Sequence, residues 1–115
     1  MRRRRFLIGR GTRPIGWAAW SASQNRVVVA NDAGPLIRWL TVEVCGDPFR
    51  FADIPPGGSV SVAFGTPRDE SRFDIRGQFA DGAEFADSCG YVVWEDYGRR
   101  FRLAVKPGGE VSCAP

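Results

Sequence analysis

Apolar and polar residues alternate with a period of two along most of the chain after residue 24. Such alternation is typical of β-strands that turn one face to a core and the other to water. The clearest stretch is 72–79, whose residues predicted to point inward are Phe73, Ile75, Gly77 and Phe79. No stretch after residue 24 has the 3.6-residue periodicity of an amphipathic helix. The pattern therefore predicts an all-β domain.

Turn-forming residues separate the alternating stretches at regular intervals, as in β-sandwiches. The predicted strands are 26–30, 36–45, 49–54, 59–65, 72–79, 83–94, 100–106 and 110–113. At 115 residues the chain is long enough for one core but not for two. We expect a single antiparallel β-sandwich of seven to eight short strands over residues 24–115, with an irregular basic segment over residues 1–23. A small closed barrel is the alternative.

The Pro-Pro-Gly-Gly sequence at 55–58 predicts a turn between two of these strands. If Ile54 lies opposite Ser59, then Phe51 lies opposite Val62, and apolar side chains meet on one face. We therefore expect 49–54 and 59–65 to form a hairpin. The preceding turn is expected at 46–48.

The turn at 80–82 predicts a second hairpin. A two-residue Asp-Gly turn would put each strand's apolar residues on opposite faces, whereas a three-residue loop with Gly82 in the left-handed conformation keeps them together. This register sets Gly77 opposite Phe85, whose ring would fill the space above the glycine. It also sets Asp87 on the apolar face, where the carboxylate would need a cationic or backbone partner unless a bulge re-aims it.

The segment 27–111 resembles the immunoglobulin-like sandwich modules of bacterial surface and envelope proteins. The resemblance rests on three turn sequences, which are 31–34 (Asn-Asp-Ala-Gly), 54–58 (Ile-Pro-Pro-Gly-Gly) and 105–109 (Val-Lys-Pro-Gly-Gly). Modules of this kind bind, space or scaffold other molecules, and the resemblance implies such a role here.

Positive charge gathers at the N-terminus. Six arginines precede residue 14, and we expect them to form an arm for an anionic partner: Arg2, Arg3, Arg4, Arg5, Arg10 and Arg13. Without them, 10 of the 16 cationic residues face 13 acidic ones, so the remaining chain has a net charge of −3. The sandwich itself therefore lacks the overall basic character of a nucleic-acid-binding module.

The sequence Arg-Arg-Arg-Phe-Leu at 3–7 resembles the twin-arginine export motif, and the resemblance implies export. The apolar stretch after it is shorter than the roughly 18–20 residues of a spanning helix. Three roles stay open for residues 1–23: a flexible basic arm, an export signal or membrane anchor, and an arm that contacts nucleic acid.

The chain contains no histidine, which excludes Ser-His-Asp and Cys-His catalysis and His-ligated zinc. We expect no enzymatic activity, no cofactor and no metal site. Acidic clusters at 69–70, 81–87 and 95–96 are predicted to be solvated turn charges. The cysteines Cys45, Cys89 and Cys113 have no metal-binding spacing. Two arrangements of the cysteines remain possible: one disulfide with one free thiol, or three buried thiols. The predicted register makes Cys89 an inert core residue that faces Phe73.

A predicted hairpin tip gathers aromatic and basic side chains that could contact a partner. They are Trp94, Tyr97, Arg99 and Arg100. We expect a non-enzymatic binding or scaffolding module of the bacterial envelope, periplasmic or membrane-associated, with a protein partner and a membrane surface within reach of the N-terminus. The alternative is a cytoplasmic β-domain whose arginine-rich arm contacts nucleic acid or a ribonucleoprotein.

Overall fold

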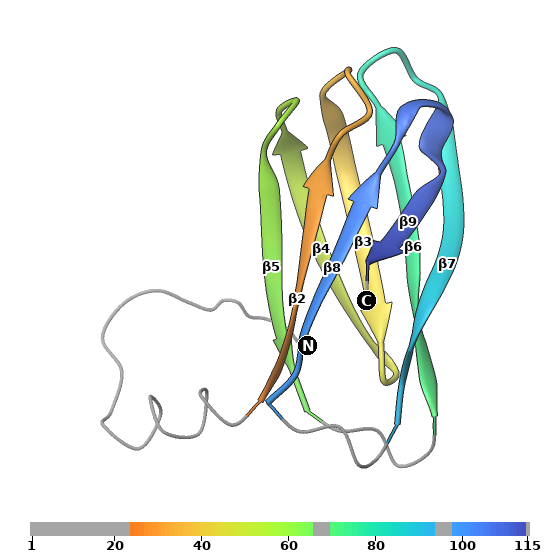
Figure 1. The fold of residues 1–115 in the computed structure, drawn as a ribbon. Helices are drawn as coiled ribbons and strands as arrows, with labels where there is room; N and C mark the ends of the chain where they lie inside the picture. Colours follow the sequence, from red (N-terminus) through yellow and green to blue (C-terminus); the bar gives the residue numbers. More distant parts are fainter. Residues whose placement is uncertain (1–23, 66–69, 94–97, 115) are drawn as a thin grey trace.

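The computed structural model describes residues 24–65, 70–93 and 98–114, which form two four-stranded sheets packed face to face (Figure 1). The sheets have the strand orders β5-β2-β8-β9 and β4-β3-β6-β7. The strands are β2 (Asn25–Asn31), β3 (Ile37–Val44), β4 (Asp47–Ile54), β5 (Ser59–Phe64), β6 (Ser71–Phe79), β7 (Glu84–Val92), β8 (Arg100–Val105) and β9 (Val111–Ala114). The predicted all-β sandwich of seven to eight strands is confirmed, and its strands pair antiparallel except for the parallel pair β2–β8. A short 3₁₀ turn, η1 (Pro107–Gly109), precedes β9.

The core lies between the sheets and is built from alternate residues of nearly every strand. Three phenylalanines from different strands meet toward the end of the sandwich where β5 ends and β8 begins: the ring centroid of Phe73 lies 5.6 Å from that of Phe64 and 5.2 Å from that of Phe101. Edge-to-face contacts of this kind add to the stabilisation from burial. The core side chains come from both sheets, so neither sheet could bury its apolar face without the other.

A buried asparagine joins the sheets at one end. The side-chain amide of Asn31 donates hydrogen bonds to the carbonyl oxygens of Pro35 (2.9 Å) and Ile54 (3.0 Å), and its Oδ1 accepts one from the Ala33 amide (3.0 Å). Asn31 is fully buried, so each polar atom needs such a partner. It thereby fixes the turn after β2 and ties it to the end of β4.

The hairpin expected between 49–54 and 59–65 is wrong. Instead, β4 pairs with β3, and β5 pairs with β2 on the other sheet. The segment 55–58 therefore crosses from one sheet to the other, and Ile54 faces Ile37 rather than Ser59. Both pairings satisfy the apolar alternation, so local sequence could not separate them.

The turn before β4 also differs from the expected one at 46–48. Val44 lies opposite Asp47, and the two residues between them have positive φ, 55° at Cys45 and 83° at Gly46. Positive φ at both central positions defines the type I′ turn, which matches the twist of a tight hairpin. Asp47 and the proline after it consequently belong to β4.

The hairpin at 80–82 is confirmed in the predicted register. Gly82 has φ of 96°, and the Phe79 amide donates to the Ala83 carbonyl at 2.8 Å. Gly77 lies opposite Phe85, and a Cβ at Gly77 would stand 2.5 Å from the end of that ring. The phenylalanine thus occupies the space left by the glycine, as expected.

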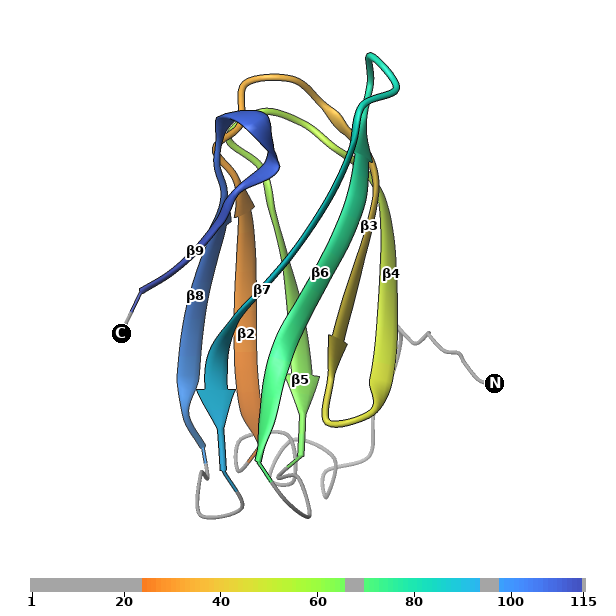
Figure 2. The ribbon, with the colours of Figure 1, turned by 90° about the vertical axis from the view of Figure 1, so that its right-hand side faces the viewer.

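A disulfide closes the side of the sandwich onto which Figure 2 looks, where β7 and β9 face the viewer. It joins Cys89 to Cys113, whose Cα atoms are 6.1 Å apart. Cys89 does face Phe73, but the expectation of an inert core thiol is wrong, because β9 brings a second cysteine beside it. Of the two cysteine arrangements left open, the structure has one disulfide with Cys45 as a free thiol.

Asp87 lies opposite Ile75 as predicted, and its partners are backbone amides. One carboxylate oxygen accepts from the Ser88 amide and the other from the Val111 amide, both at 2.9 Å. The second bond reaches from β7 to the start of β9 and so reinforces the side closed by the disulfide.

Candidate binding surface

The two sheets carry opposite charge. Strands β2, β5, β8 and β9 contain three arginines and no acidic residue. Strands β3, β4, β6 and β7 contain four arginines and six acidic residues, a net charge of −2. Although the domain as a whole has a mild negative charge, the strands of the sheet β5-β2-β8-β9 have a net charge of +3. This sheet is therefore the candidate for contact with an anionic partner.

The three arginines share one face. In β2 and β8 the alternate residues Val27, Val29, Phe101, Leu103 and Val105 are buried, so Arg26, Arg100 and Arg102 point away from the core. Arg26 and Arg100 are direct neighbours across the parallel β2–β8 ladder, and Arg102 lies beside Val28. We call these three arginines together with Lys106, which follows β8, the basic face.

A shallow groove of about 270 Å³ runs over this face. Four small side chains line it: Val28, Ala30, Ala104 and Ser112. The charged side chains that line it are Arg102, Lys106 and Asp32. Small residues on a sheet allow another molecule to approach the backbone closely, and two cations against one carboxylate give the lining a net charge of +1.

Hydrogen bonds to neutral groups hold two of the guanidinium groups. Nη1 of Arg26 donates to Oγ of Ser61 at 2.6 Å, and Nη1 of Arg100 donates to the carbonyl oxygens of Gln24 and Gly98, each at 3.3 Å. These bonds orient the groups without neutralising them. Across residues 24–65, 70–93 and 98–114, none of the three arginines forms a salt bridge.

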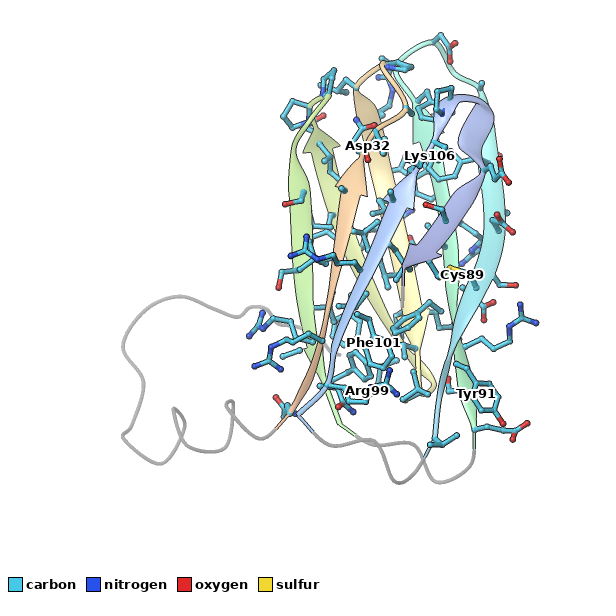
Figure 3. All side chains as sticks on the ribbon, viewed as in Figure 1. Asp32, Cys89, Tyr91, Arg99, Phe101 and Lys106 are labelled. Carbon is cyan, nitrogen blue, oxygen red and sulfur yellow. A yellow bond between two sulfur atoms is a disulfide. The ribbon has the colours of Figure 1, made fainter. Side chains whose placement is uncertain are left out.

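Lys106 differs from the arginines, because Asp32 lies beside it. Their Nζ and Oδ2 atoms are 3.8 Å apart, and both side chains are about half exposed (Figure 3). A pair this open to water contributes little free energy, so a stronger anion can displace the carboxylate. We therefore place the arginines at the centre of the candidate surface and Lys106 at its margin.

The surface predicted from sequence is only partly described. Trp94, Tyr97 and the six N-terminal arginines lie outside the described residues. Arg99 packs on the core, with its guanidinium carbon 4.7 Å from the centroid of the Phe101 ring (Figure 3). Its backbone amide also donates to Oδ1 of Asn25 at 2.8 Å. Arg100 points to the other side, onto the basic face.

Sequence reasoning missed Arg26 as a member of the surface and left Arg102 outside the four residues of the predicted tip. The outward position of Arg102 followed from the alternation in its strand. Its proximity to Arg26 depends on the parallel pairing of β2 with β8, which lie more than seventy residues apart in the chain. Grouping charged residues by sheet face would have identified Arg26 and Arg102 as neighbours, but such a grouping requires the strand order.

Asp81, Cys45 and Tyr91 belong to the other sheet or to its turns. Asp81, in one of the acidic clusters, accepts a hydrogen bond from the Ala83 amide at 2.9 Å within its own turn. The pKa of the Cys45 thiol is raised mainly by burial and further by the nearby Asp47 carboxylate, while a hydrogen bond with Ser71 opposes the rise. Tyr91 donates a hydrogen bond to the Glu70 carboxylate, and this bond is the main cause of its raised pKa.

Neither a metal centre nor a membrane-spanning helix is found in the described part of the chain. It contains no group of three or more side chains placed to hold a metal ion. It also contains no helix long and apolar enough to cross a membrane.

Comparison with known proteins identifies the fold and nothing more specific. No protein-family model matches the chain, and no curated protein matches it. A solved structure, the NMR structure of a protein from Eubacterium rectale, superposes with a TM-score of 0.56 at 11% sequence identity. The match covers 81% of this chain and 87% of that one. At this identity the similarity concerns the arrangement of strands alone.

Proposed function

We propose that this protein is a non-enzymatic binding domain of the bacterial envelope that uses its basic face to hold an acidic segment of a protein partner. The observation that carries the proposal is the charge distribution: one sheet has three arginines and no acidic residue, and all three point to the same side. An arrangement without compensating acids favours binding of an anion over stabilisation of the fold.

The disulfide supports a location outside the reducing cytoplasm. Stable disulfides are rare in cytosolic proteins and common in exported ones, and the bond between Cys89 and Cys113 closes the sandwich. The resemblance of residues 3–7 to an export motif agrees with this location. So does the resemblance to immunoglobulin-like envelope modules, which carry binding surfaces on a rigid sandwich.

The chemistry of the face suits carboxylates. A guanidinium group can donate two parallel hydrogen bonds to one carboxylate, and Arg26 and Arg100 are adjacent enough to engage neighbouring acidic side chains of an extended segment. Residues 1–23 join the sandwich directly before β2, at the end of the sheet where Arg26 and Arg100 lie.

The test uses a fluorescently labelled oligo-glutamate peptide and the full-length protein, with binding followed by anisotropy over a range of salt concentrations. We expect the triple variant R26Q/R100Q/R102Q to bind about 10- to 150-fold more weakly, since three exposed charge contacts of about 0.5–1 kcal/mol each are lost. Its affinity should also depend less steeply on salt.

The matched control is R38Q/R72Q/R76Q, which removes the same charge from exposed positions of the other sheet. This variant should retain most of the affinity. Equal losses in both triple variants would show that only net charge matters and would refute the proposed face. Tighter binding of a single-stranded oligonucleotide of equal charge, lost when Arg2–Arg5 become Gln, would favour the nucleic-acid alternative.

A further inference from the structure

Within residues 24–65, 70–93 and 98–114, the outer edge of β5 lacks the protection that the other sheet edges have. An edge strand exposes unpaired backbone groups, and proteins shield such edges with charges, prolines, irregular residues or covering elements. The shielding residues in the edge strand β4 are Asp47, Pro48, Arg50 and Asp53, and the backbone of Asp53 has the left-handed conformation (φ 56°). β7 and β9 are joined to each other by the disulfide and by the Asp87 carboxylate.

β5 has the sequence Ser-Val-Ser-Val-Ala-Phe, with no charge, no proline and no residue of positive φ. No other described strand pairs with its outer edge. Alternating serine and β-branched residues pair readily with a further strand. This edge therefore has the properties of a strand-addition site.

The hydrogen bonds of β2 show which groups of β5 face outward. The Asn31 amide donates to the Gly58 carbonyl, whereas the Arg26 amide donates to Arg99 on the opposite side. Because amide direction alternates along a strand, the backbone groups of Val60, Val62 and Phe64 face β2. Those of Ser59, Ser61 and Ala63 consequently face the open edge.

We propose that two copies of this chain dimerise by antiparallel pairing of their β5 strands about a two-fold axis at Ser61. Ser61 would then pair with Ser61 of the second copy, and Ser59 with Ala63, so that every outward amide and carbonyl finds a partner. Val60 would lie opposite Val62 on the inner face. The segment is self-complementary: these side chains are small, and none of them is charged.

Self-pairing explains the absence of edge protection better than an unrelated strand does. A partner with a charged strand would be matched by charges on β5, as in other specific interfaces, and β5 has none. The closest charge is Arg26, which belongs to β2 and whose guanidinium bonds the Ser61 hydroxyl in its own chain. Closed two-fold dimers are also the commonest oligomers of soluble proteins.

The dimer would form one continuous sheet of eight strands, with the order β9-β8-β2-β5 repeated in reverse in the second copy. The basic faces of both copies would lie on the same side of this sheet. If the proposed function holds, a long acidic segment could contact both faces at once and gain affinity through the linkage. The dimer itself does not depend on that function.

The test substitutes the residue on the two-fold axis with either charge. Ser61→Lys places two like charges opposite one another, beside the Arg26 guanidinium of each chain, and we expect it to weaken dimerisation about tenfold or more. Ser61→Glu can pair with Arg26 of its own chain and should weaken dimerisation less. Sedimentation velocity of the full-length protein measures the effect. An equal mixture of the two variants should restore a dimer, and native mass spectrometry should identify it as one Lys chain with one Glu chain.

Ala52→Lys and Ala52→Glu serve as controls, because Ala52 is an exposed small residue on β4, the corresponding edge of the other sheet. They should leave the dimer intact. A wild-type chain that stays monomeric up to roughly 100 µM, where micromolar association would be visible, would overturn the proposal. So would dimerisation that the Ser61 variants do not change, or that the Ala52 variants abolish. Thermal unfolding confirms that each variant is folded.

Discussion

The disulfide between β7 and β9 gives the most direct prediction about stability. The change is reduction of the bond, or its removal as C89A/C113A, in a Cys45→Ser background that leaves no other thiol to exchange with it. We expect both treatments to lower the free energy of unfolding by similar amounts, because a crosslink acts largely by restricting the unfolded chain.

The sequence separation sets the size of the effect. The bond joins residues 24 positions apart, and the loop-entropy relation gives about 3.5 kcal/mol for a loop of that length. For a domain of about this size, each kcal/mol shifts Tm by roughly 4–8 °C. Reduction should therefore lower Tm by roughly 14–28 °C. That is a large fraction of the stability of a small domain.

The assay is calorimetry or circular dichroism with and without a reductant that does not absorb in the far ultraviolet. The C89A/C113A variant is the control, since its Tm should not respond to reductant. If the oxidised and reduced proteins melt within a few degrees of each other, the disulfide does not constrain the fold. The argument that it marks an exported domain would then lose its physical basis.

Two further predictions concern a glycine and the free thiol. Gly77→Ala should lower the free energy of unfolding by about 1–3 kcal/mol, because its Cβ would stand 2.5 Å from the Phe85 ring and 2.7 Å from a backbone carbonyl oxygen. The control is Gly65→Ala, whose Cβ would meet nothing within 4 Å and which should be neutral or stabilising. Urea unfolding measures both variants, and equal effects would contradict the packing argument. The raised pKa of the Cys45 thiol should keep it protonated to higher pH, so that iodoacetamide alkylates it more slowly at pH 8 in the native chain than in urea. Asp47→Asn should speed the native reaction, and identical native and unfolded rates would refute the assigned burial.

The sequence by itself determined the strands and one hairpin. Alternation fixed which residues enter the core, and it did so because a half-buried strand must present apolar residues at every second position. At 80–82 the loop length followed as well, since only one choice kept Phe73, Ile75 and Phe79 on the same face as Phe85. The absence of histidine likewise limited the chemistry, because no other side chain has an unperturbed pKa close to neutral pH.

Strand pairing was decided only in three dimensions. The alternation of 49–54 fits 59–65 and 37–44 equally well, because any two alternating strands can match their apolar faces. The choice depended on a type I′ turn at Cys45 and Gly46, which favours pairing of β4 with β3. It depended also on the Asn31 side chain, which holds the end of β4 against the turn after β2.

The candidate surface is the clearest product of tertiary structure. Arg26 and Arg100 are neighbours because β2 and β8 run parallel at the centre of one sheet, a contact between distant parts of the chain. The disulfide partner of Cys89 could not be predicted from sequence either, because Cys113 lies beside Cys89 only after η1 turns the chain and β9 runs next to β7. Sequence patterns report local periodicity, whereas charge clusters and crosslinks depend on which strands become neighbours.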